Sequence, residues 1–190
     1  GAPIGDGHDA ALCAGLIPAM GAGGGLQLEH PVSPRLLAQA ETIQDTYSGW
    51  YPSALRRIAL EAEARPALRA AEGVGCMFSA GVDSYYSVLK QEASITHLIF
   101  IHGHDIAYDE TVRYETVSAA IRGAAEALGK PLIEAHTNLR TFADRHAEWA
   151  AHYFGAAMAS VAHLLSPSLG RVLIPASCDF ASVRPWGSHP

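Results

Sequence analysis

The sequence predicts an α/β fold in which a parallel sheet carries helices on both faces, preceded by a mainly helical leader. Short apolar runs alternate with longer amphipathic stretches between residues 73 and 176, in the order strand, helix, strand, helix, strand, helix, strand. This alternation is typical of a parallel sheet with helical crossovers. With 190 residues, of which 49% are hydrophobic, the chain is long and apolar enough to bury such a core.

The leader, residues 1–70, is predicted to begin with loops and to continue with helices. Gly and Pro punctuate residues 1–34, which predicts little regular structure there. Ser33 is a predicted N-cap with Pro34 at the first helical position, and apolar residues follow at helical spacing. The elements expected in the leader are a short strand over 26–30, helices over 35–50 and 52–63, and a short helix from the break at Arg65-Pro66 to Ala71.

Residues 71–190 are predicted to form the domain that carries the sheet. Gly129 follows the longest amphipathic stretch and is placed to end a helix as its C-cap. Ligands of parallel sheets bind beyond the carboxyl ends of the strands, so the segments that follow each strand are the candidate site. The elements expected are strands over 74–79, 96–102, 131–136 and 171–176, and helices over 84–91, 111–128 and 142–165.

Composition limits the classes of function. Thirteen basic and nineteen acidic side chains give a formal net charge of −6, so we expect no general binding of nucleic acid. Cys13, Cys76 and Cys178 form no C-x-x-C pair, which argues against a disulfide framework and favours a cytoplasmic protein. The weakly polar run 10–26 has no basic flank and predicts neither a signal peptide nor a membrane span. The missing initial Met and the abrupt end at Pro190 suggest a chain trimmed from a longer one.

The segment Ser79-Ala80-Gly81-Val82-Asp83-Ser84 lies where the first strand of the sheet ends and a helix begins. Gly81 allows the backbone to approach an oxyanion, and the N–H groups of the turn and of the helix start form an anion-binding concavity. Ser79 and Ser84 add hydroxyl donors. The Asp83 carboxylate is tolerated beside phosphates only if it holds a cation such as Mg²⁺. The pattern therefore predicts a site for a polyphosphate and a metal ion.

This segment resembles the S-G-G-x-D-S pyrophosphate loop of the PP-loop ATP pyrophosphatases. That superfamily includes the synthetase domains of asparagine, GMP, NAD and argininosuccinate synthetases and the tRNA-thiolating enzymes. Ala80 stands where the family usually has glycine, a departure that alanine tolerates if its φ is negative. The resemblance implies the PP-loop, HUP-like form of the Rossmann-like three-layer fold. Further similarity to bacterial PP-loop proteins lies in residues 98–103, 137–140, 174–177 and 185–190.

The resemblance also implies a half-reaction. ATP is cleaved between its α and β phosphates, an oxygen of the substrate is adenylated, and a nucleophile displaces AMP. We therefore expect an AMP-forming, ligase-type enzyme that uses ATP and Mg²⁺. It would adenylate a carboxyl, amide or ureido oxygen of a small molecule for attack by an amine or ammonia. Catalysis of this kind depends on positioning and on charge stabilisation.

Roles for individual residues follow from the resemblance and from position. The pyrophosphate loop, Ser79 to Ser84, binds the phosphates; Asp83 holds the metal, and Asp83 and Ser84 act in catalysis. The resemblance places adenine against the backbone at the end of the second strand. Arg140 follows the third strand, where it is expected to pair with phosphate or a substrate carboxylate, the alternative being a solvated arginine at a helix start. The full candidate set is Phe100, Ile101, His102 and Gly103 for adenine, Arg140 for catalysis, and His104, Asp105, Ser177, Arg184 and Ser188 for the substrate.

Alternative interpretations stay open at this point. His102, His104 and Asp105 are also candidate metal ligands, although the two histidines have no obvious third ligand beyond this segment and no H-E-x-x-H helix is present. The same scaffold could serve sulfur transfer with Cys178 as carrier, or a nucleotide sensor without turnover. Trp50, Tyr51 and the leader helices could cover a second copy of the chain, so a homodimer is one expectation.

Overall fold

The computed structural model describes residues 2–66, 69–176 and 181–189. The chain divides into two compact units, each described by itself. The first, called the sheet unit, comprises Gly1–Ile4, Ala70–Asn138 and Leu165–Ser182. The second, called the helical unit, comprises Gly5–Arg69, Leu139–Leu164 and Val183–Pro190. A boundary thus falls at residue 70, and the leader forms a unit with two segments from later in the chain.

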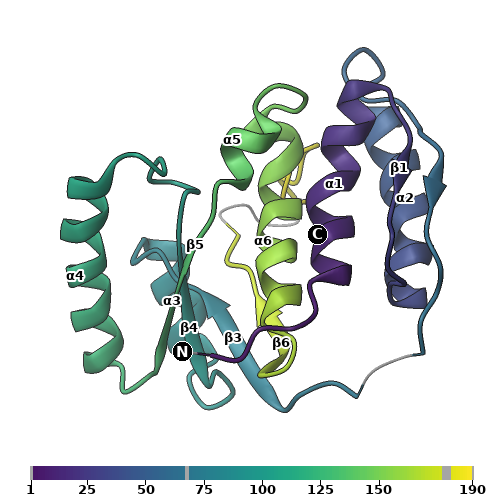
Figure 1. Ribbon diagram of the computed structural model, residues 1–190. Helices are drawn as coiled ribbons and strands as arrows, with labels where there is room; N and C mark the ends of the chain where they lie inside the picture. The colour runs from purple at the N-terminus through teal and green to yellow at the C-terminus, as the bar shows by residue number, and fades with distance from the viewer. Residues whose placement is uncertain (1, 67–68, 177–180, 190) are drawn as a thin grey trace. The chain divides into compact units, whose positions relative to one another are not determined.

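The sheet unit is built on four parallel strands in the order β5-β4-β3-β6, as Figure 1 shows. This parallel sheet, flanked by helices and accompanied by a helical N-terminal region, confirms the predicted α/β class. The second and third strands lie within the predicted ranges, whereas the first begins one residue and the last two residues earlier than expected, and both end earlier. The strands are β3 (Gly73–Met77), β4 (His97–His102), β5 (Leu132–His136) and β6 (Leu169–Leu173).

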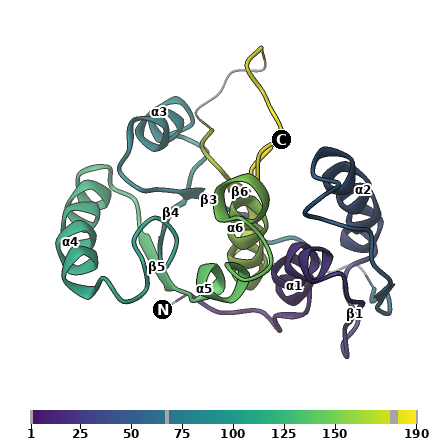
Figure 2. The same ribbon diagram turned by 90° about the horizontal axis from the view of Figure 1, so that it is seen from above.

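Two helices of the sheet unit, α3 (Val82–Lys90) and α4 (Thr111–Ala127), connect the first three strands and lie beside the sheet (Figures 1 and 2). They bury one apolar face against it, because Val88 of α3 and Ile121 of α4 belong to the same cluster as Cys76 and Leu98 of the strands. Each of these four side chains is fully buried. The two helices therefore pack on β3 and β4 through one shared apolar cluster.

The strand order defines a topological switch point. From β3 the chain moves through β4 to β5, and it later returns to the opposite side of β3 as β6. In open α/β sheets, ligands bind beyond the carboxyl ends of the strands at such a reversal. The segment that follows β3 is therefore at the favoured position.

The helical unit contains α1 (His8–Ala22), α2 (Pro34–Trp50), α5 (Leu139–Ala143), the π-helix η1 (Trp149–Tyr153) and α6 (Phe154–Leu164). Two short parallel strands, β1 (Leu26–Gln27) and β2 (Leu60–Glu61), complete it. Helix α2 begins as predicted, with the Ser33 hydroxyl accepting a hydrogen bond from the Leu36 amide at 3.3 Å. In the described part of the chain no helix is long and apolar enough to cross a membrane.

The prediction of little regular structure before residue 34 is wrong, because His8–Ala22 forms α1 despite Pro18 inside it. Proline lacks the N–H that would bond to the carbonyl of Ala14 four residues earlier. The Tyr153 hydroxyl donates to that carbonyl at 2.9 Å and replaces the missing donor. Helix α6 runs beside α1 (Figure 1), and the Ser160 hydroxyl donates to Ala10 O at 3.0 Å. The packing of α1 on α6 and these two hydrogen bonds stabilise α1, although its local sequence does not favour a helix.

The helix predicted over 52–63 is also wrong. The backbone N–H of Arg56 donates to the Met20 carbonyl at 3.1 Å, and that of Ile58 donates to the Gln44 side-chain oxygen at 2.8 Å. These donors bond to other elements, and the segment then forms β2 beside β1. The expected short helix before Ala71 is absent from residues 69–71, and residues 67–68 lie outside the described chain.

Candidate functional site

The turn after β3 contains the predicted pyrophosphate loop. Phe78 is still held to the sheet, its N–H donating to Ile99 O at 2.7 Å. Ser79 is exposed, and Gly81 adopts an extended conformation (φ −78°, ψ 164°) as the N-cap of α3. The strand-turn-helix context expected from the sequence is therefore present.

Ala80 departs from the expectation that its φ is negative. Its φ is +59°, and it is the one non-glycine residue with positive φ in the described chain. This left-handed conformation costs an L-residue about 1 kcal/mol because Cβ crowds the following carbonyl. The backbone therefore has the shape that glycine favours, although alanine occupies the position. Strained residues of this kind cluster at ligand-binding sites.

The start of α3 lies at the protein surface. Its N-cap residue, Gly81, has no side chain to cap the helix, and both Gly81 and Val82, the first helical residue, are exposed. The first N–H groups of a helix lack intrahelical partners and carry the positive end of its dipole. Such an end binds anions. At this position it lies beyond β3, at the switch point of the sheet.

The two polar side chains of this first turn differ in orientation. Ser84 is buried (4% exposed) and its hydroxyl donates to the Gly81 carbonyl at 2.8 Å. Its single proton therefore stabilises the turn in this structure, where the sequence had suggested a donor to phosphate. Asp83 is exposed. Its carboxylate lies in the first turn of α3, a position from which it could hold Mg²⁺ on a bound polyphosphate.

The end of β4 forms the neighbouring part of this edge. Phe100, Ile101 and His102 are buried. Gly103 has φ +98°, and a Cβ there would lie 1.8 Å from the Thr137 carbonyl oxygen, so only glycine fits. The Gly103 N–H donates to Ile106 O, and the His102 carbonyl accepts from the Thr137 N–H, both at 3.0 Å. These main-chain groups, expected to contact adenine, are thus already used by the fold.

His104 and Asp105 follow β4 directly. His104 is 4% exposed, whereas Asp105 is exposed. No three His, Cys, Asp or Glu side chains of the described chain are grouped so that they could hold a metal ion. The structure therefore gives no support to a three-ligand metal site built from His102, His104 and Asp105.

A chain of polar side chains that was not predicted from the sequence lies at the same edge. His102 and His136 are register partners that end the parallel strands β4 and β5, and their Nδ1 atoms lie 3.3 Å apart. The other ring nitrogen of His136 lies 3.3 Å from the Tyr114 hydroxyl, which donates to Glu134 at 2.8 Å. Arg122 completes the chain with bonds of 2.7 and 2.8 Å to that carboxylate. Aligning the two strand ends would have revealed the pair, because both strands end in histidine.

Glu134 and Tyr114 hold definite protonation states. Burial raises the pKa of Glu134, but hydrogen bonds from Arg122 and Tyr114 outweigh it and the pKa is lowered. Burial, together with the Glu134 carboxylate, raises the pKa of Tyr114. At neutral pH the carboxylate is therefore ionised and the phenol keeps its proton.

Three other predicted residues belong to the helical unit. Arg140 stacks over the Trp149 ring at 5.4 Å, and Arg184 stacks over Trp186 at 5.2 Å. Ser188 is half-buried in the C-terminal segment. Ser177 and Cys178 lie outside the described residues.

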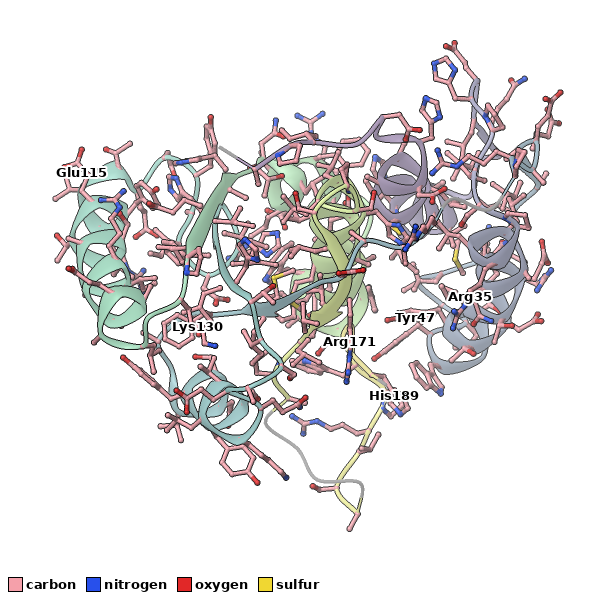
Figure 3. All side chains as sticks on the ribbon, turned by 90° about the horizontal axis from the view of Figure 1, so that it is seen from below. Arg35, Tyr47, Glu115, Lys130, Arg171 and His189 are labelled. Atoms are coloured by element: carbon pink, nitrogen blue, oxygen red, sulfur yellow. The ribbon has the colours of Figure 1, made fainter. Side chains whose placement is uncertain are left out.

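The C-terminal segment, which carries the substrate candidates Arg184 and Ser188, is held by hydrogen bonds within the helical unit. The Gly155 N–H donates to the Gly187 carbonyl at 2.8 Å, and a Cβ on Gly155 would lie 2.0 Å from that oxygen. Tyr47 of α2 donates to the same carbonyl at 3.2 Å, and its side chain points toward the segment that carries His189 (Figure 3). The Trp50 and His189 rings are 4.8 Å apart.

Two of the cysteines are poor nucleophiles. Burial raises the pKa of Cys13 to about 12 and that of Cys76 to about 11. Because the thiolate is the reactive form, neither side chain is suited to carry sulfur at neutral pH.

A comparison with models of known protein families finds no match, and neither a curated protein nor a solved structure matches the chain significantly.

Proposed function

We propose that the protein binds the polyphosphate end of ATP at Ser79–Ser84 and cleaves ATP to AMP and pyrophosphate while adenylating a small molecule. One observation carries the proposal: an exposed helix start with a glycine N-cap lies beyond β3, at the switch point of a parallel sheet. This place and this donor set suit a polyphosphate. The likeness of the loop to the PP-loop sequence supplies the reaction type.

The residues present fit ATP with Mg²⁺. Gly81 has no side chain that would crowd an approaching phosphate, and Ser79 beside it is exposed. Mg²⁺ keeps several waters and is usually held by one or two carboxylates together with substrate phosphates. Asp83 supplies one such carboxylate, so the ion needs no cluster of protein ligands. It would neutralise charge on the phosphates.

In this proposal the chain contributes positioning. The N–H groups at the start of α3 hold the phosphates, and Ser84 keeps the turn in shape through its bond to Gly81 O. Fixed dipoles directed at developing charge lower the barrier without reorganisation. An oxygen of the acceptor attacks the α phosphorus, the bond to the β-phosphate oxygen breaks, and pyrophosphate leaves. An amine or ammonia then displaces AMP from the adenylate.

The experiment is a product analysis. The protein is incubated with Mg²⁺, ATP labelled at the α phosphate and a pool of small metabolites, and labelled AMP is separated from ADP. We expect AMP to form with the native protein and to fall at least about a hundredfold with Asp83→Ala. Glu115→Ala, on the outer face of α4 (Figure 3), should match the native protein. Formation of ADP, or equal AMP from Asp83→Ala, would exclude this mechanism.

A further inference from the structure

The hydrogen-bond pattern around His102 and His136 fixes which ring nitrogens carry protons. His102 Nε2 lies 3.1 Å from the Ala107 carbonyl. A carbonyl only accepts, so this nitrogen bears the hydrogen and a neutral His102 keeps a lone pair on Nδ1.

The hydrogen bonds of His136 likewise place its proton on Nε2. The Tyr114 hydroxyl gives its single proton to Glu134, which lies at 2.8 Å and is bonded to Arg122. The phenol oxygen can then accept a hydrogen bond from His136 Nε2 at 3.3 Å. In the neutral ring this again leaves the lone pair on Nδ1. The two nitrogens that carry these lone pairs are therefore 3.3 Å apart. This arrangement favours a cation that both nitrogens bind.

The spacing corresponds to that of two ligands on one metal ion. With Zn–N bonds of about 2.0 to 2.1 Å and tetrahedral angles, two ligating nitrogens lie about 3.3 Å apart and their ring centroids about 5 Å apart. The observed separations are 3.3 Å for the Nδ1 atoms and 5.4 Å for the centroids, with the rings at 80°. Metal-bound histidines also commonly donate their other N–H to a carbonyl or to a carboxylate-linked group. Both histidines here have such a partner.

We propose that His102 and His136 form a two-histidine site for a divalent first-row transition metal ion such as Zn²⁺. The ion is bound through both Nδ1 atoms, and its other positions are open to water or to a substrate donor. Imidazole ligands favour zinc, copper and nickel over magnesium. His136 is exposed, which gives the ion access, while buried His102 forms the fixed inner ligand. This site goes beyond the proposed ATP chemistry and is independent of it.

Calorimetric titration of the whole chain with Zn²⁺ tests the site. The native protein should bind one more ion than His136→Gln, because this variant removes one ligand of the pair and leaves the other nine of the ten histidines unchanged. His97→Gln is the matched control, since His97 begins β4 at the opposite edge of the sheet. It should bind as the native protein does. His136 is exposed, and circular dichroism checks that its variant is folded.

A second variant separates ligation from a general effect on the fold. Tyr114→Phe keeps both imidazoles but removes the group that orients His136, so the Zn²⁺ affinity should fall about tenfold while one ion still binds. Co²⁺ in place of Zn²⁺ should give the visible absorption of a tetrahedral ion in the native protein and in His97→Gln but not in His136→Gln. If His136→Gln binds as many Zn²⁺ ions as the native protein with equal affinity, the proposal is wrong and a shared proton fills the gap.

Discussion

The Tyr153 hydroxyl donates to the Ala14 carbonyl, the acceptor that Pro18 leaves without its helical partner. Tyr153 is fully buried, so Tyr153→Phe leaves a carbonyl of α1 unsatisfied and should lower the free energy of unfolding by about 1 to 3 kcal/mol. Urea unfolding measures this change.

A double-mutant cycle identifies the cause. Pro18→Ala restores an N–H to α1, so Tyr153→Phe should cost clearly less in that background. An equal cost in both backgrounds would show that the phenol acts through packing alone.

Ala80 gives a second prediction about stability. Ala80→Gly removes the strain of φ +59° but increases the entropy of the unfolded chain, so a gain of up to about 1 kcal/mol is expected. Thermal unfolding is the measurement. A loss of stability would mean that the turn does not have the left-handed conformation described.

Gly155 gives the third prediction, which also concerns stability. Gly155→Ala places a methyl group against the Gly187 carbonyl and should destabilise the protein by about 1 to 3 kcal/mol or release the C-terminal segment, which changes Trp186 fluorescence. Gly123 in α4 is the matched control, because a Cβ there meets nothing within 4 Å. Gly123→Ala should stabilise by about 0.5 to 1 kcal/mol. Equal effects of the two substitutions would contradict the contact.

The fourth prediction concerns pH. Burial lowers the pKa of His163 below its ordinary value of 6.5, although Asp9, 3.8 Å away, opposes this shift. The folded protein therefore disfavours the protonated ring. The contribution of the neutral His163 ring to the free energy of unfolding should be fully present above about pH 6.5. It should be lost as the pH decreases through the folded-state pKa. Melting temperatures across this range should fall less for His163→Gln than for the native protein. Parallel curves would assign the pH dependence to other groups.

The sequence was sufficient to predict the elements that depend on interactions between neighbouring residues. Helix α2 begins at Pro34 after the Ser33 cap, β4 and β5 lie within the predicted apolar runs, and β3 begins one residue before its run. The fold class and the position of the candidate loop followed from these elements. The roles proposed for the loop residues stay predictions.

Other features depend on contacts between distant residues and left no readable pattern. Helix α1 contains an internal proline and is stabilised by Tyr153, 139 residues away. The backbone of Ile58 bonds to the side chain of Gln44, so a helical pattern gave a false prediction. By contrast, the pairing of His102 with His136 could have been inferred by aligning the two strand ends, and the register observed in the structure establishes it.

The central claim, that Ser79–Ser84 binds the polyphosphate of ATP, is tested most directly by calorimetric titration with Mg²⁺–ATP in competition with pyrophosphate. Gly81→Val is the decisive variant. Valine readily adopts φ −78° and ψ 164°, so the protein should fold while the new side chain obstructs the turn. We predict that pyrophosphate displaces ATP, that AMP does so weakly, and that Gly81→Val lowers ATP affinity at least about tenfold. ATP binding that pyrophosphate does not displace and that Gly81→Val leaves unchanged would contradict the claim.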